Sequence, residues 1–247
     1  MQPQTSSPFA TPPAPLAVPS DAAREFEEFV YLISHDVRSS VRALIELPQW
    51  IVEDLEEAGV PITGSVASSI EMMNRHTGRL DRMLVDLLTY SRIGRMQNVV
   101  RNDLGLTLDQ VLEEIKVPSD FVLVRDLMVD QLTLGERDVL TLFGALIQNA
   151  VRHHDKPSGR IIISTTQEGA HFVLRVADDG PGVAEKFRER VFGVMQTLRP
   201  RDEVEGSGLG LSNVRKIAEV YGGHASIGAS PFGRGACVEV RIHQPPS

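Results

Sequence analysis

A glycine-rich run near the C-terminus carries the clearest chemical signal in the chain. It reads Gly206-Ser207-Gly208-Leu209-Gly210-Leu211-Ser212-Asn213 and leads into the pattern of a helix. Glycine adopts backbone angles that other residues avoid, and it lets a ligand approach the main chain closely. The helix that follows would present unpaired N–H groups and a positive dipole end to an anion. These features predict a loop that binds a nucleotide phosphate, whereas an isolated glycine cluster more often marks a plain turn.

Two further blocks upstream of this loop add polar side chains. Asp178-Asp179-Gly180-Pro181-Gly182 follows a strand pattern, and Asn149-Ala150-Val151-Arg152-His153 ends an apolar helix pattern. A carboxylate at Asp178 can accept a hydrogen bond from the amino group of adenine, which would select adenine over guanine. The alternatives are an ordinary strand-end turn at Asp178 and the satisfaction of buried backbone groups by Asn149.

A fourth block, Ser34-His35-Asp36-Val37-Arg38-Ser39, lies in a long helical pattern. At roughly 100° per residue, His35 points about 180° away from the centre of the apolar stripe of that helix. It is therefore expected on the outer face, where both a nucleotide domain and a protein partner can reach it. A neutral imidazole is nucleophilic near pH 7. His35 is thus a candidate phosphoacceptor, and an ordinary surface histidine is the alternative.

The four blocks, in this order, resemble those of the sensor histidine kinases of bacterial two-component systems, and residues 198–206 look most like kinases that follow bacterial phytochromes. The match spans roughly residues 25 to 243. The resemblance implies that Nε2 of His35 attacks the γ-phosphate of ATP, while Asp36 holds the other ring nitrogen or acts as the base. It also implies Mg²⁺ as the metal ion, with Asn149 as a ligand.

The resemblance assigns a set of residues to the nucleotide. These are Asn149, Arg152, His153, Asp178, Gly180, Gly182, Gly206, Gly208, Leu209 and Gly210. Residues 196–205 correspond to the mobile loop that covers the nucleotide. The chain departs from the family at Ala145, where a second asparagine is usual, and at Ser40, where a proline is usual.

Two long amphipathic helices are predicted ahead of the nucleotide blocks. They cover residues 21 to about 58 and a second stretch that ends near Gly94, and residues 58–64 break the pattern between them. Joined by a short turn, they form a hairpin. One hairpin covers two apolar stripes poorly, so we expect two copies to pair into a four-helix bundle, which makes the protein a homodimer. Docking of the hairpin on the chain's own second domain is the alternative.

Beyond about residue 100 the pattern is that of an α+β sandwich. Helices are predicted over 104–115, 135–154 and 209–221, and strands over 121–127, 160–166, 171–177, 225–228 and 236–242. The resemblance implies the Bergerat ATP-binding fold. The predicted organisation is a disordered proline-rich tail or linker (1–20), a dimerisation and phosphotransfer hairpin (21–97) and a catalytic ATP-binding domain (98–247).

The composition narrows the class of protein. The 247 residues carry a net charge of −8 and a pI near 5.4, which argues against nucleic acid as the main partner. No apolar run approaches the ~20 residues of a membrane span, and the N-terminus lacks a signal-peptide pattern. The single cysteine, Cys237, fits a reducing interior. A cytoplasmic location is expected.

The expected function is that of an ATP-dependent protein histidine kinase that phosphorylates itself on His35. An aspartate on the receiver domain of a separate response regulator would then take the phosphoryl group, since the chain has no receiver-like acidic cluster with a following lysine. No input domain is recognisable, so either a separate sensor protein supplies the signal or the chain is part of a longer protein. The alternatives are a histidine phosphotransfer protein with a non-catalytic ATPase-like domain, and a GHKL ATPase or serine/threonine kinase whose hairpin serves only dimerisation.

Overall fold

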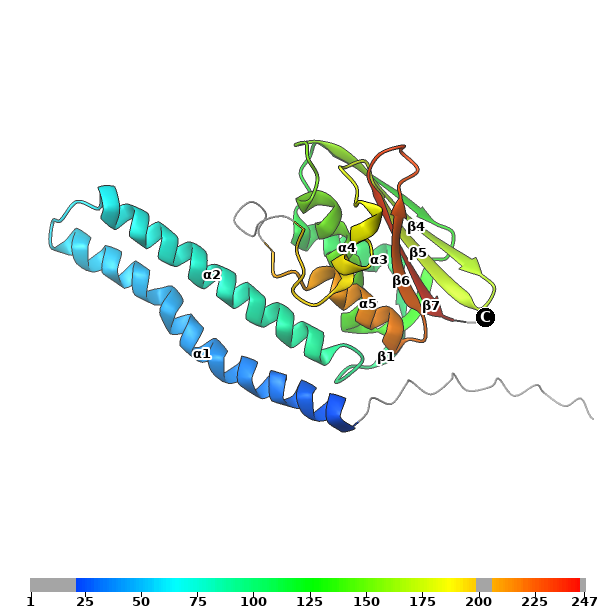
Figure 1. The fold of residues 1–247 in the computed structure, drawn as a ribbon, viewed down its shortest axis with the longest axis horizontal. Coiled ribbons are helices and arrows are strands. Elements are labelled where there is room, and N and C mark those ends of the chain that lie inside the picture. Colours follow the sequence, from blue (N-terminus) through cyan, green and yellow to red (C-terminus); the bar gives the residue numbers. More distant parts are fainter. Residues whose placement is uncertain (1–20, 199–205, 245–247) are drawn as a thin grey trace, which may run out of the picture.

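The chain folds into a long helical hairpin and an α/β sandwich that lies beside one end of it (Figure 1). The computed structural model describes residues 21–198 and 206–244, without the side chains of residues 21–30, 34 and 35. The hairpin consists of α1 (Asp21–Glu57) and α2 (Gly64–Arg92). The sandwich begins at Val99. The expected tail over residues 1–20 lies outside the described residues.

The turn between the two helices is short and has a glycine near each end. Gly59 has φ 67° and Gly64 has φ 57°, in the left-handed region that residues with a side chain avoid. Pro48 lies inside α1, which continues past it although proline cannot donate the intrahelical hydrogen bond. The helix break predicted over residues 58–64 is confirmed by the turn between the helices, which folds α2 back along α1.

Side-chain pairs fix the register of the antiparallel helices. The guanidinium of Arg92 lies 5.2 Å from the ring centroid of Tyr31, and Nε of Arg38 lies 3.8 Å from Oδ1 of Asp81. Residues 31–38 of α1 therefore lie level with residues 81–92 of α2. His35 falls within this stretch of α1.

The sandwich is built on a five-stranded mixed sheet with the order β2-β4-β5-β7-β6. Its strands are β2 (Phe121–Leu127), β4 (Gly159–Glu168), β5 (His171–Asp178), β6 (His224–Ala229) and β7 (Ala236–His243). β2 pairs with β4 in parallel, and the other pairs are antiparallel. A separate two-stranded sheet joins β1 (Val99–Asp103) to β3 (Gln131–Gly135).

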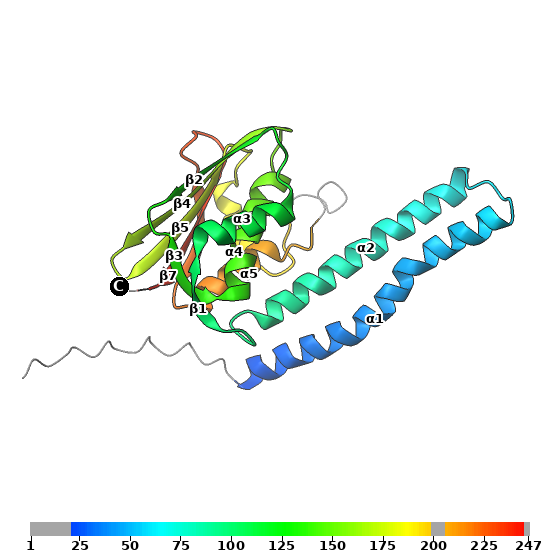
Figure 2. The ribbon, with the colours of Figure 1, turned by 180° about the vertical axis from the view of Figure 1, so that it is seen from behind.

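Three helices cover one face of the large sheet (Figure 2). They are α3 (Leu104–Ile115), α4 (Glu136–Arg152) and α5 (Gly210–Val220), and two short 3-10 turns, η1 (Glu185–Phe187) and η2 (Arg190–Phe192), precede α5. Phe143 and Leu146 of α4 are buried against Phe172 and Leu174 of β5 in one continuous core. Burial of such side chains is the main stabilising term of the sandwich.

The end of the hairpin is fastened to the sandwich. Nζ of Lys216 in α5 donates to the carbonyl oxygen of Tyr90 at 2.9 Å and lies 4.3 Å from the centroid of its ring. The N–H of Gly94, just after α2, donates to Oδ2 of Asp138 at 2.9 Å. A Cβ at Gly94 would come within 2.6 Å of Val220, so glycine permits this close approach.

The predicted α+β class is confirmed, and the hairpin is present. The predicted helix at 135–154 is α4, which is shorter at both ends, and the strands β1 and β3 were not predicted. The four-helix dimer stays a prediction. Among the described residues, no helix combines the length and the hydropathy that crossing a membrane would require.

Candidate nucleotide-binding site

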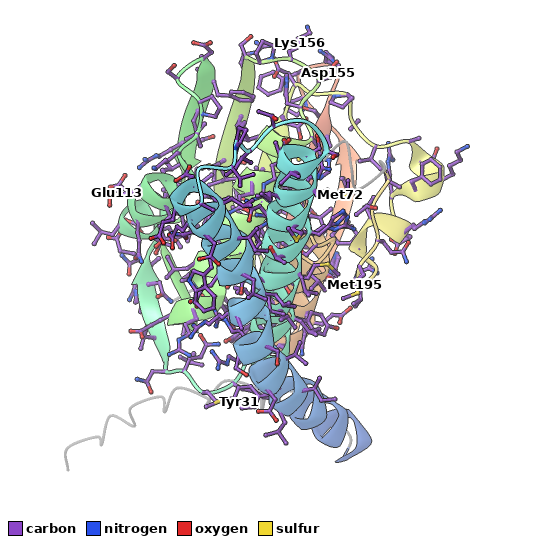
Figure 3. The ribbon with its side chains drawn as sticks, turned by 90° about the vertical axis from the view of Figure 1, so that its left-hand side faces the viewer. Tyr31, Met72, Glu113, Asp155, Lys156 and Met195 are labelled. Atoms are coloured by element: carbon purple, nitrogen blue, oxygen red, sulfur yellow. The ribbon has the colours of Figure 1, made fainter. Side chains whose placement is uncertain are left out.

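A cavity of about 590 Å³ lies where the hairpin meets the helical layer of the sandwich. Its wall comes from α2, α3, α4, the start of α5 and the loops that precede α5. Figure 3 views the molecule from the hairpin side and shows Glu113 of α3 and Met195 on opposite sides of the sandwich. Residues assigned to the nucleotide from the sequence line this cavity: Asn149, Arg152, His153, Gly182, Gly206, Gly208 and Gly210.

One face of α4 supplies the polar side of the cavity. Its lining residues recur at helical spacing: Thr141, Ala145, Gln148, Asn149 and Arg152. The opposite face carries the buried core residues of α4. His153 follows as the C-cap, and its N–H donates to the carbonyl oxygen of Asn149 at 3.2 Å. The helix thus places an amide and a guanidinium on the same side of the cavity.

The glycine-rich loop forms the neighbouring wall. Gly208 has φ 75°, and a Cβ there would lie 2.9 Å from the carbonyl carbon of Met195, so the loop requires glycine. Oγ of Ser207 accepts the N–H of Leu209 at 3.1 Å. No side chain caps α5, which begins at Gly210 in the cavity wall. Its first N–H groups therefore remain free of intrahelical partners and suit a phosphate.

Asp178 is held at the end of β5 by main-chain donors. Its Oδ1 accepts the N–H of Gly180 at 2.9 Å and that of Ala236 at 3.3 Å, and the residue is buried. Burial raises the pKa of the Asp178 carboxyl, although these two hydrogen bonds oppose the shift. Asp178, Gly180 and Leu209 do not line the cavity, but Gly182, two residues beyond Gly180, does. Asp178 is therefore close to the cavity without lining it, and its Oδ1 is engaged by the main chain.

Asp179, the residue after Asp178, is largely shielded from solvent. Its side chain is only 18% exposed. Oδ1 accepts the N–H of Arg160 at 2.6 Å and lies 3.2 Å from Nε2 of His154, while Oδ2 accepts Nε of Arg160 at 3.1 Å. Burial by itself would raise the pKa of Asp179, but these hydrogen bonds outweigh it and lower the pKa to about 2. The ionised carboxylate anchors the strand end that carries Asp178.

His154 was not singled out from the sequence, yet its side chain is almost fully buried. Its Nδ1 lies 3.1 Å from both the main-chain nitrogen and the carbonyl oxygen of Lys156, and its Nε2 lies 3.2 Å from Oδ1 of Asp179. Its ring packs edge-on against Phe121. No local pattern distinguishes it from its neighbour His153, because its partners come from distant strands.

Asp86 of α2 is the second residue that the sequence did not indicate. It lines the cavity from the hairpin side. Burial raises the pKa of its carboxyl, while a hydrogen bond with the side chain of Ser207 and the charges of Arg152 and Arg82 lower it. A carboxylate thus lies beside the loop expected to bind phosphate.

The proposed phosphoacceptor lies on the other helix of the hairpin. The side chain of His35 lies outside the described residues, but its backbone belongs to α1. Asp36, next along, is exposed. The register places this part of α1 level with residues 81–92 of α2, the stretch that contributes Asp86 and Thr89 to the cavity. The candidate acceptor and the cavity therefore lie at the same height on the hairpin.

Fold and site define a nucleotide-binding α/β sandwich joined to a helical hairpin. The family model described as histidine kinase-, DNA gyrase B-, and HSP90-like ATPase matches residues 135–246. The chain belongs to the sensor histidine kinases that carry an ATPase domain of this kind, so the family resemblance seen in the sequence is confirmed.

Two relatives illustrate the match. The chain is 31% identical over 228 residues to the methanogenesis regulatory histidine kinase FilI of Methanothrix harundinacea, covering 90% of this chain and 25% of that protein. It is 26% identical over 216 residues to the phytochrome-like protein Cph1 of Synechocystis, covering 84% of this chain and 28% of that protein. The chain thus spans about a quarter of the length of these relatives.

Two solved structures share the fold. Full-length ShkA in complex with AMPPNP aligns with a TM-score of 0.66 at 21% identity, over 90% of this chain and 46% of that one. Histidine kinase ThkA in complex with the response regulator protein TrrA aligns with a TM-score of 0.56 at 16% identity, over 91% of this chain and 64% of that one. These alignments extend over both the hairpin and the sandwich.

Proposed function

We propose that the chain is an ATP-dependent protein histidine kinase that phosphorylates His35. The observation that carries this proposal is the cavity itself, in which the polar face of α4 and the glycine-rich start of α5 meet α2 level with His35. The family membership and the complex of ShkA with AMPPNP support ATP as the ligand. Asp178 would read the adenine amino group, and the N–H groups at the start of α5 would bind phosphate.

Mg²⁺ would be held by the amide oxygen of Asn149, where it would neutralise charge on the phosphates. The donor chemistry fits such a group, since Asn149 lines the cavity and an amide oxygen is a ligand that Mg²⁺ accepts beside phosphates. Ala145, one turn before Asn149, has no oxygen in its side chain. Phosphate oxygens and water would therefore complete the metal's ligands.

The reaction has two steps. Nε2 of His35 attacks the γ-phosphorus, the bond to the bridging oxygen breaks, and ADP leaves. Asp36 accepts the hydrogen bond of Nδ1–H and so keeps the lone pair on Nε2. A receiver-domain aspartate of a response regulator then displaces His35 from phosphorus and restores the neutral ring. The partner protein in the ThkA structure supports this class of acceptor.

The exposed surface of the hairpin supports the proposal of a homodimer, because many large apolar side chains along the hairpin are exposed in the single chain. They are Leu32, Ile33, Val37, Leu44, Leu47, Trp50, Ile51, Val60, Val66, Met72, Met73 and Leu80. Such a patch is typical of a protein interface. Sedimentation should give a dimer for the wild-type chain and a monomer for Leu44→Glu. A wild-type monomer at all accessible concentrations would refute this part of the proposal.

The kinase proposal is tested with γ-labelled ATP and Mg²⁺. Wild type should acquire label that is lost in acid and kept in alkali, and both His35→Ala and Asn149→Ala should lose it. His76→Ala removes another histidine of the hairpin and should keep the label. Folded wild-type dimer that binds ATP without acquiring label would instead favour a phosphotransfer protein whose ATPase-like domain is not catalytic.

A further inference from the structure

The hairpin inserts a carboxylate into the wall of the candidate nucleotide site. Asp86 lies on α2, on the side of the helix opposite to the buried Leu84 and Leu88. Asp86 itself lines the cavity, together with Thr89 of the next turn. This face of α2 is therefore turned toward the sandwich, and its carboxylate is half-buried there.

The contacts of Asp86 are those that an anionic ligand would make. Oγ of Ser207 already accepts the N–H of Leu209, so its own O–H is the group left to donate to the Asp86 carboxylate. The positive charge of Arg152 also acts on Asp86. Both residues line the cavity where the phosphates of a nucleotide are expected.

Neighbouring contacts hold α2 in this position. The ammonium group of Lys216 binds the carbonyl oxygen of Tyr90 and lies over its ring. Tyr90 follows Asp86 by one turn, so the same contact that docks α2 on α5 also keeps Asp86 against the glycine-rich loop. Gly94 then ties the end of α2 to Asp138.

We propose that Asp86 is an internal competitor for the phosphates of the nucleotide, an inference that rests on the proposed ATP site. A second anion in the same place repels a charged phosphate group strongly, because the cavity is partly shielded from water. The phosphates and the docked carboxylate therefore exclude each other. By linkage, whatever loosens α2 from the loop strengthens nucleotide binding, and nucleotide binding loosens α2 to the same extent.

The test compares the wild-type chain with Asp86→Asn, which keeps the shape of the side chain and removes its charge. Calorimetry in the presence of Mg²⁺ would measure binding of adenosine, ADP and ATP. Asp86→Asn should bind ATP about tenfold more tightly than wild type, ADP by a smaller factor, and adenosine equally. Glu71→Gln, an exposed carboxylate on the same helix, is the matched control and should match wild type for all three ligands.

Each contrary result has a separate meaning. Unchanged or weaker ATP binding by Asp86→Asn would overturn the inference and leave the nucleotide site standing. An equal gain for adenosine would also overturn it, because the effect would not depend on phosphate. If neither chain bound any of the three ligands while both were folded by circular dichroism, the inference and the proposed function would fail together.

Discussion

The phenol oxygen of Tyr221 lies 2.8 Å from Oδ2 of Asp138, in the buried joint between the hairpin and the sandwich. The same carboxylate oxygen accepts the N–H of Gly94, and the phenol oxygen accepts the N–H of Gly135 at 3.1 Å. Burial raises the pKa of Tyr221 above its usual range, and the negative charge of Asp138 adds to this shift. The hydroxyl therefore remains a donor at neutral pH. One hydroxyl at the end of α5 thus connects the linker after α2 to the start of α4.

Replacing Tyr221 by phenylalanine should destabilise the protein. The change leaves a buried N–H and a buried carboxylate each short of a partner, which costs about 1–3 kcal/mol. Urea or thermal unfolding measures the loss. Tyr31→Phe is the control, because the guanidinium of Arg92 lies over the face of the Tyr31 ring, a contact that phenylalanine keeps. This substitution should change the unfolding free energy by no more than about 0.5 kcal/mol. Equal losses in the two variants would contradict the assigned role of the hydroxyl.

Asp178→Asn should weaken ATP binding and reduce the preference for ATP over GTP. The amide can still accept from Gly180 and Ala236 through its oxygen, so the strand end keeps its geometry. In the proposed binding mode its NH₂ group would face the base, where adenine needs an acceptor. We expect at least a tenfold loss of ATP affinity by calorimetry. The control is Asp155→Asn, a more exposed carboxylate paired with Arg234, and an equal loss there would refute base reading by Asp178.

Local sequence patterns predicted most of the helices because helical periodicity is a property of neighbouring residues. The strands β1 and β3 escaped prediction because their stability is not local. β1 carries Arg101, Asn102 and Asp103, a poor strand sequence by itself. It forms because β3 pairs with it, and because Nδ2 of Asn102 donates to the carbonyl oxygens of Leu132 and Leu134.

The contrast between local sequence pattern and tertiary contact also explains which part of the site could be predicted. The glycine-rich run and the end of α4 are contiguous blocks, and the structure brings them to one cavity. Asp86 is an ordinary helix residue until α2 docks on the sandwich, and that docking depends on Lys216 and Tyr90. Its place in the cavity wall is set by tertiary packing, which no pattern around Asp86 encodes.

The depressed pKa of Asp179 predicts a specific dependence of stability on pH. A carboxyl whose folded-state pKa is about 2, against an ordinary 3.8, stabilises the fold fully above about pH 5. That contribution is lost as the pH falls through 4 toward 2. The difference in unfolding free energy between wild type and Asp179→Asn should therefore be largest near pH 7 and shrink over this acid range. Asp120→Asn, at an exposed site, is the control, and a difference for Asp179→Asn that does not vary with pH would contradict the assignment.

Substitutions at two glycines of the loop before β7 distinguish the cost of backbone strain from the cost of a steric clash. Gly233 (φ 78°) and Gly235 (φ 97°) both lie in the left-handed region, but a Cβ at Gly233 would meet nothing within 4 Å. A Cβ at Gly235 would overlap the carbonyl oxygen of Asp178. Gly233→Ala should therefore cost about 1–2 kcal/mol from strain alone. Gly235→Ala should cost more and also weaken ATP binding, since it displaces Asp178. Thermal unfolding and calorimetry measure both effects, and equal behaviour of the two variants would show that the strand end yields without moving the carboxylate.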